Sequence, residues 1–268
     1  MNSYIMLLGL SLWGCGTKAG DTSSDTATED TGEPTVVNPE DTAEPGDYVA
    51  ISGTMNWGDG SPAEGADVQV CASLCRRTSV QSDGSWELTG LDKEAYIVLG
   101  FVQGDASITT TVSLVDMQED KNIGAMTLKP YATQVAFTAG MHEYVLDGGL
   151  HISFNSDDIS SGLYSVSFND MVSSLKVDGD SVPHDLQDRE ILGMWMLGDF
   201  DYHVSSGISW RLDDTFGLDE GASIEMLILN NEAHAWDSLG TFPLENGAFA
   251  GGDATFPYLS TIVMLRAE

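Results

Sequence analysis

Short runs of alternating apolar and polar residues begin at Tyr48 and continue to the end of the chain, separated by clusters of turn-forming residues. An alternation of period two is typical of strands that bury one face, and many short strands with regular turns are typical of a β-sandwich. No amphipathic run of helical length stands out. The sequence therefore predicts an all-β fold with two antiparallel β-sandwich domains in tandem, at residues 48–129 and 130–268.

The alternation also places the individual strands and their faces. Val68 and Val70 are expected on one face of their strand, and Ile224, Met226 and Ile228 on one face of theirs, because side chains repeat every second residue. In the first domain we expect strands at Val49–Trp57, Ala66–Ala72, Cys75–Gln81, Ser85–Thr89, Ala95–Val102, Ser107–Leu114 and Ile123–Lys129. In the second we expect them at Gln134–Thr138, Leu150–Phe154, Tyr164–Phe168, Ser173–Val177, Ile191–Leu197, Gly207–Leu212, Ser223–Leu229, Ala235–Phe242 and Leu259–Leu265.

The first 15 residues have the character of an export signal. An apolar run from Ile5 to Trp13 is too short for a membrane-spanning helix but suits the hydrophobic region of a signal peptide. The run ends in Gly14-Cys15, which resembles the lipobox of bacterial lipoproteins. That resemblance implies that Cys15 is diacylated, becomes the mature N-terminus and attaches the protein to a membrane.

Residues 16–47 form an acidic segment rich in Thr, Asp, Glu and Pro, whose only bulky apolar residues are Val36 and Val37. Such a segment cannot bury enough surface to offset the entropy cost of ordering, so we expect a disordered tether. An acidic cation-binding tail and an O-glycosylated stalk are alternatives that the composition leaves open.

Cys71 and Cys75, the two cysteines beyond the leader, flank a three-residue loop between two expected strands. A zinc site is the alternative to a disulfide, but no second pair of Cys or His follows at the spacing of a zinc motif. We therefore expect a disulfide across the end of a hairpin, with a Cα separation near the usual ~5.5 Å. Because the loop is short, its main effect would be to fix the strand register.

The first domain contains a set of turn and strand motifs that occur together. They are Ile51-Ser52-Gly53-Thr54, Pro62, Gly65-Ala66-Asp67-Val68, Asp83-Gly84-Ser85-Trp86-Glu87-Leu88, Gly90-Leu91, Tyr96, Val98 and Ile123-Gly124-Ala125-Met126-Thr127-Leu128. The turn Asp83-Gly84 is also a hairpin signal in its own right. With these motifs the domain resembles the carboxypeptidase regulatory-like domain, a transthyretin-like or carbohydrate-binding-like β-sandwich of exported bacterial proteins. The resemblance implies a non-catalytic module that positions other domains or binds carbohydrate or protein.

The charge balance narrows the range of partners. The chain has 42 acidic and 10 basic residues, a formal net charge of −32. Nucleic acid is an unsuitable partner, because binding to a phosphate backbone needs clustered Lys and Arg. Divalent cations and basic polymers remain compatible with the charge, and solubility alone is sufficient to explain it.

Catalytic motifs are not apparent, and we expect no enzymatic activity. The chain has no Gly-x-Ser-x-Gly, and Ser173-Ser174-Leu175-Lys176 matches Ser-x-x-Lys without the companion motifs of that enzyme class. The histidines show no metalloprotease spacing, and ordinary core or surface roles are expected for them. They are His142, His151, His184, His203 and His234.

Two binding sites are conceivable in the second domain. The first is a calcium site, because hard cations take oxygen ligands and several loops carry paired acids. Its candidate ligands are Asp157, Asp158, Asp178 and Asp180, and Asp213-Asp214 is a similar loop. The second is a sugar-stacking platform of Trp195, Trp210 and Trp236, although a Trp in a sandwich is more often part of the core.

Together these features predict a protein of the bacterial cell envelope that is exported and attached by Cys15, and we expect it at the outer membrane or cell surface. We expect a non-catalytic binding or structural module with no cofactor other than the conceivable calcium. The expected partners are the membrane, through the lipid, and a polysaccharide or another envelope protein. A carbohydrate-binding surface protein that uses the tryptophans is the alternative, and an enzyme of unrecognised type ranks third.

Overall fold

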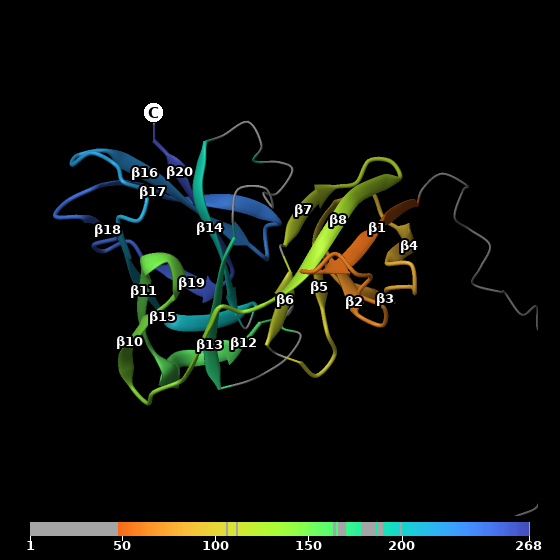
Figure 1. Ribbon diagram of the computed structural model, residues 1–268, viewed down its shortest axis with the longest axis horizontal. Coiled ribbons are helices and arrows are strands. Elements are labelled where there is room, and N and C mark those ends of the chain that lie inside the picture. Colours follow the sequence, from red (N-terminus) through yellow and green to blue (C-terminus); the bar gives the residue numbers. More distant parts are fainter. Residues whose placement is uncertain are drawn as a thin grey trace, which may run out of the picture. The chain divides into compact units, whose positions relative to one another are not determined.

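Strands make up nearly all of the regular structure, which confirms the predicted all-β class (Figure 1). The computed structural model describes residues 48–267 except 106, 111, 163–164, 166–169, 178–185, 187–189 and 199. The structure also contains the 3-10 turns η1 (Asp147–Gly149) and η2 (Ser156–Asp158). The described residues contain no helix with the length and hydrophobicity of a membrane span. The leader, Cys15 and the acidic segment lie outside them.

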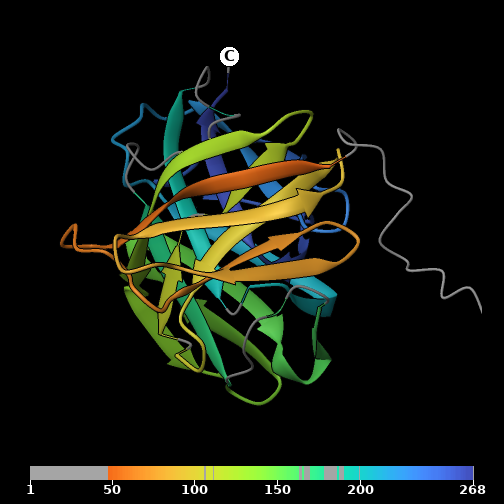
Figure 2. The ribbon, with the colours of Figure 1, turned by 90° about the vertical axis from the view of Figure 1, so that its right-hand side faces the viewer.

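The first sheet of the N-terminal half contains one parallel strand pair, which differs from the purely antiparallel expectation. Strands β1 and β8 run parallel, whereas β1 and β4 are antiparallel, and Figure 2 shows these three as neighbouring arrows in lime (β8), orange (β1) and amber (β4). In spatial order the sheet comprises β4 (Ser85–Leu91), β1 (Val49–Trp57), β8 (Lys121–Pro130) and β6 (Ile108–Thr110).

The second sheet packs on the first and encloses a core with it. Val68 and Val70 point into this core, as the alternation predicts, together with Trp86, Tyr96 and other buried side chains of both sheets. In spatial order the second sheet comprises β3 (Cys75–Ser79), β2 (Asp67–Cys71), β5 (Ala95–Phe101) and β7 (Ser113–Asp116).

At two places the chain passes from one of these sheets to the other, although the sequence predicts a single strand at one of them and a hairpin at the other. The expected strand Ser107–Leu114 is two strands, because β6 pairs with β8 in the first sheet and β7 pairs with β5 in the second. The Asp83-Gly84 turn also forms, with Gly84 at a φ of 84°. It links β3 of the second sheet to β4 of the first, and so is not the turn of a simple hairpin.

The C-terminal half contains two further sheets. The third sheet comprises β17 (Ala235–Pro243), β16 (Ser223–Asn230), β20 (Thr261–Arg266), β14 (Ile191–Gly198), β13 (Met171–Val177) and β9 (Thr133–Ala136). The fourth sheet, which we call the outer sheet, comprises β10 (Met141–Val145), β11 (Leu150–Asn155), β15 (Tyr202–Asp213), β12 (Ile159–Ser161), β18 (Ala248–Ala250) and β19 (Phe256–Leu259). In the outer sheet the long strand β15 pairs with β11 and β12 on one side and with β18 and β19 on the other.

The C-terminal half has its own hydrophobic core, which lies between the third sheet and the outer sheet. Ile224, Met226 and Ile228 all point into it, which confirms the face predicted for this strand. The strand predicted at Tyr164–Phe168 lies almost entirely outside the described residues. β10, which carries exposed side chains at four of its five positions, was not predicted.

A third hydrophobic core, which we call the interface core, joins the two halves of the chain. It contains Ile97 and Leu99 of β5 together with Met194 of β14 and Val263 of β20, so the second and third sheets pack against each other. The prediction of two separate domains is therefore not confirmed, because residues on both sides of position 130 share this core. The four sheets form a stack with a hydrophobic core between each pair of neighbouring layers.

Candidate functional site

The outward face of the outer sheet aligns side chains from four strands in one row. Register places Val145, His151, Arg211 and Ala250 opposite one another on β10, β11, β15 and β18. The residue beside each of them in sequence is buried in the core between the third and outer sheets. Because successive side chains of a strand point to opposite faces, the row faces away from that core.

An ionic cluster lies in the middle of this row. The Nε2 atom of His151 is 3.0 Å from Nη2 of Arg211 and 3.2 Å from Oδ2 of Asp213. On the other side of the ring, Nδ1 of His151 is 3.4 Å from Oε1 of Glu143. Arg211 also donates from Nη1 to Oδ1 of Asp213. The imidazole is thus flanked by two carboxylates and one guanidinium, and only 13% of its side-chain surface is exposed.

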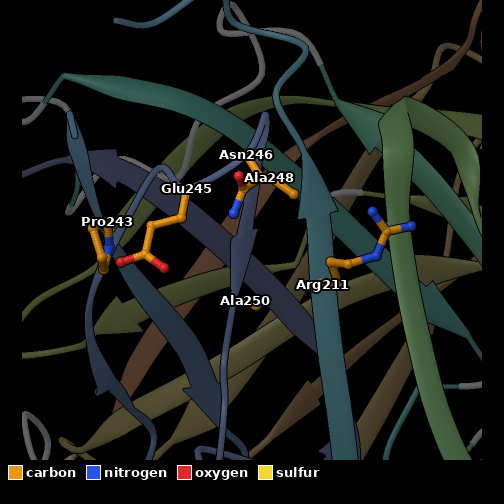
Figure 3. Close-up of a pocket in the computed structure, with 6 residues that line it drawn as sticks. All are labelled: Arg211, Pro243, Glu245, Asn246, Ala248 and Ala250. Carbon is orange, nitrogen blue, oxygen red and sulfur yellow. The ribbon is translucent and has the colours of Figure 1, made fainter. Parts of the chain in front are cut away.

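A shallow hollow of about 540 Å³ adjoins the cluster (Figure 3). The aliphatic stem of Arg211 forms one wall, while its guanidinium turns away from the hollow toward a strand drawn in green. The remaining lining residues are Pro243, Glu245, Asn246, Ala248 and Ala250. Small side chains on the short strand β18 leave the floor open.

Exposed apolar side chains lie on the same face. Met141 is 69% exposed and Val145 is 58% exposed, both on β10. Tyr48 and Leu74 are the other exposed large hydrophobic residues in the described part of the chain. Clustered exposed apolar residues beside polar groups are typical of contact surfaces, whereas single ones need no explanation.

The three candidate tryptophans do not form a sugar-stacking platform. Trp195 is fully buried, with its Nε1 donating to the backbone oxygen of Asp147 at 2.9 Å, and Lys176 lies over its ring. Trp210 is 5% exposed and packs edge-on against Phe242. Trp236 is partly buried against the interface core. Stacking on a sugar requires an accessible ring face, and the first two rings offer none.

The acidic loops that the structure describes hold their carboxylates in different surroundings. Asp157 is exposed and Asp158 half-buried in η2, and Asp214 accepts hydrogen bonds from the backbone amides of Phe216 and Leu218. Among the described residues, no three His, Cys, Asp or Glu side chains are placed to hold a metal ion. Asp178 and Asp180 lie outside the described residues, so a calcium site that includes them stays a prediction.

The Ser-x-x-Lys match has no catalytic geometry. Ser173 and Lys176 are three apart in β13, which places their side chains on opposite faces of the third sheet. Ser173 is fully buried and its Oγ receives a hydrogen bond from Gln134, while Lys176 contacts the rings of Trp195 and Phe216.

A second polar cluster is buried at the start of β15. The carboxylate of Asp201, a residue only 1% exposed, accepts a hydrogen bond of 2.7 Å from Asn231 and lies 3.1 Å from Nε2 of His203. Ser260 donates to Asn231 at 3.0 Å. Burial raises the pKa of the adjacent Tyr258, so its phenol stays protonated. The cluster satisfies its buried polar groups internally, as a structural network does.

The remaining predicted histidines have other surroundings. His142 packs edge-on against Tyr144, and His234 has a positive φ of 49° in the turn before β17. His184 lies outside the described residues. Neither sequence spacing nor composition indicates the cluster around His151, because its members come from three strands that only the sheet register aligns.

Cys71 and Cys75 are paired with their sulfurs 2.07 Å apart, as predicted, and face each other across the β2–β3 hairpin. Their Cα atoms are 4.0 Å apart, which is closer than the expected value. Cys71 is fully buried in the interface core and Cys75 packs at its edge. The pair therefore stabilises the strand that packs on the C-terminal half.

The fold and this surface define an all-β protein with an outward sheet face as its best candidate for binding. Comparisons with protein-family models and with curated proteins found no match to this chain.

Proposed function

We propose that this protein is a lipid-anchored, non-catalytic binding module of the bacterial cell envelope, and that it binds another envelope protein through the outward face of the outer sheet. The lipid on Cys15 would attach the protein to the membrane, and the acidic segment of residues 16–47 would hold the folded part away from that membrane. The resemblance of the N-terminal half to carboxypeptidase regulatory-like domains supports a non-catalytic role.

The observation that carries the binding surface is the position of Met141 and Val145. Both side chains are exposed on one edge strand, next to an ionic cluster and a hollow. Protein interfaces combine exposed apolar residues at their centre with a polar rim, and aliphatic side chains next to Arg211 and Glu143 fit that pattern. Sugar stacking has less support, because Trp195 and Trp210 are buried.

Site-specific photo-crosslinking in the native host tests the surface. A photoreactive amino acid is placed at Met141, at Val145, or at the exposed Glu87 of β4 as a matched control on a different sheet. We expect one discrete cross-linked species from the first two positions and none from Glu87. Equal products at all three positions, or none at Met141 and Val145, would contradict the proposal.

The anchor is tested by intact mass measurement on protein extracted from membranes with detergent. We expect a mature chain that begins at Cys15 and carries diacylglycerol. A product that retains residues 1–14 or is cut elsewhere would contradict the lipid anchor and leave the binding surface to be judged by the cross-linking alone.

A further inference from the structure

We propose that His151 is a proton-operated latch that sets the position of the Arg211 guanidinium beside the hollow. The latch concerns the atoms of the ionic cluster, and its use in binding rests on the proposed function of the outward face.

Two neighbouring side chains place incompatible demands on one nitrogen of His151. Nε2 of His151 lies 3.0 Å from Nη2 of Arg211 and 3.2 Å from Oδ2 of Asp213. A guanidinium can only donate, so the contact with Arg211 requires a lone pair on Nε2. A carboxylate can only accept, so a hydrogen bond with Asp213 requires a proton on the same atom. The two hydrogen bonds therefore cannot form at the same time, and they belong to different tautomers or protonation states of the ring.

In the neutral state Arg211 donates to Nε2, and the single ring proton must be on Nδ1. That nitrogen is buried and makes no hydrogen bond with the described residues, but Oε1 of Glu143 lies 3.4 Å from it, so the negative charge of the carboxylate favours a proton there. Arg211 is then held by two groups, with Nη1 on Asp213 and Nη2 on His151. Its head group turns away from the hollow, as Figure 3 shows.

Protonation of the ring reverses these preferences. An imidazolium carries N–H groups on both sides, and they face Glu143 of β10 and Asp213 of β15. The ring then has the same charge as the guanidinium of Arg211, whose Nη2 lies at hydrogen-bond distance, so the two groups repel each other. Histidine side chains commonly gain this proton between pH 8 and pH 5. Asp213 retains Nη1, so the guanidinium pivots without leaving and swings from β11 toward the hollow over β18.

The tautomer is read directly by two-dimensional ¹H–¹⁵N NMR of the full chain at pH 8, which distinguishes a proton on Nδ1 from one on Nε2. The His151→Gln variant assigns the resonance. We expect the Nδ1–H form for His151. In Arg211→Leu, which removes the donor, we expect the proton to move to Nε2, facing Asp213. In Arg266→Leu, which breaks an exposed ion pair with Glu190 elsewhere, we expect no change.

The pivot is read from the side-chain nitrogen resonances of Arg211 at pH 8 and pH 5. We expect them to shift in the unmodified protein and not in His151→Gln. An Nε2–H tautomer at pH 8, or Arg211 resonances that do not respond to pH, would overturn the latch. A working latch without cross-linking at Met141 would instead contradict only the proposed binding surface, so the two failures are distinguishable.

Discussion

Tyr96 and Ile97 are neighbours in β5, yet their side chains belong to different hydrophobic cores. Tyr96 packs between the two sheets of the N-terminal half, whereas Ile97 packs in the interface core with residues of the C-terminal half. β14 shows the same division, with Trp195 on one face and Met194 on the other. Both strands are thus covered on both faces, and the second and third sheets are inner layers of the stack.

The interface core predicts a large effect of truncating Ile97. This side chain is fully buried, and Ile→Ala substitutions in cores cost about 2–5 kcal/mol of unfolding free energy. We expect Ile97→Ala to fall in that range in urea denaturation. Leu74→Ala, at a residue that is 78% exposed, should change the free energy by less than about 0.5 kcal/mol. Similar values for the two variants would show that Ile97 is not packed as described.

The Cys71–Cys75 disulfide closes a short loop, so its removal should have a moderate cost. Loop-closure entropy for a ring of this size corresponds to about 2 kcal/mol. We expect the double variant Cys71→Ala/Cys75→Ala to lose about that amount. Cys71→Ser/Cys75→Ala should lose more, because a hydroxyl would be buried in the interface core. Equal stability of the two double variants would contradict the burial of Cys71.

Three Asp-x-Ser turns should give the protein an acid-sensitive component of stability. In each turn the serine hydroxyl and backbone amide donate to the aspartate, and these hydrogen bonds lower the pKa of Asp59, Asp83 and Asp105. A lowered folded-state pKa means stability that is present above the unfolded value of about 3.9 and is lost as pH falls through the folded value.

Replacing one serine tests this cause. In Ser85→Ala the side-chain donor to Asp83 is gone, so the pKa of Asp83 should rise toward its ordinary value. The carboxyl carbon of Asp83 is followed by NMR titration, with Asp59 and its intact partner Ser61 as the internal reference. An unchanged pKa of Asp83 would mean that the hydroxyl does not stabilise the carboxylate.

The buried network at Asp201 predicts that two substitutions of Asn231 destabilise the protein by different amounts. Asn231→Ala removes a donor from a carboxylate that is almost fully buried, which should cost about 1–3 kcal/mol. Asn231→Asp places a second acid against the first and should cost more, because two like charges are then buried together. Thermal denaturation at pH 7 compares them, and an Asp variant as stable as the original protein would contradict the buried contact.

Much of the fold was predictable from the alternation of residues. The bounds of β1 agree with the prediction, and the faces of β2 and β16 are confirmed. The prediction of a single strand at Ser107–Leu114 was wrong, because alternation does not show where a chain passes from one sheet to another. The same is true of β1 and β8, whose parallel pairing is a long-range property.

The stacking of the two halves left a signal in the sequence that the prediction did not use. β5 is apolar at consecutive positions from Tyr96 to Leu99, which is typical of a strand buried on both faces. The ionic cluster left no such signal, since Glu143, His151 and Arg211 are brought together only by register. The tryptophans could not be assigned either, because the period of a strand does not distinguish a core face from a binding face.

Because the two halves of the chain share the interface core, we expect them to unfold together. This cooperativity is tested by ¹⁹F NMR of fluorotryptophan-labelled protein in urea, where Trp86 reports the N-terminal half and Trp195 the C-terminal half. The probe variant is Val98→Ala, which truncates a side chain in the N-terminal core alone. We expect the unfolding midpoints of Trp86 and Trp195 to coincide and to fall together in this variant. A midpoint of Trp195 that stays unchanged while that of Trp86 falls would show that the two halves unfold independently.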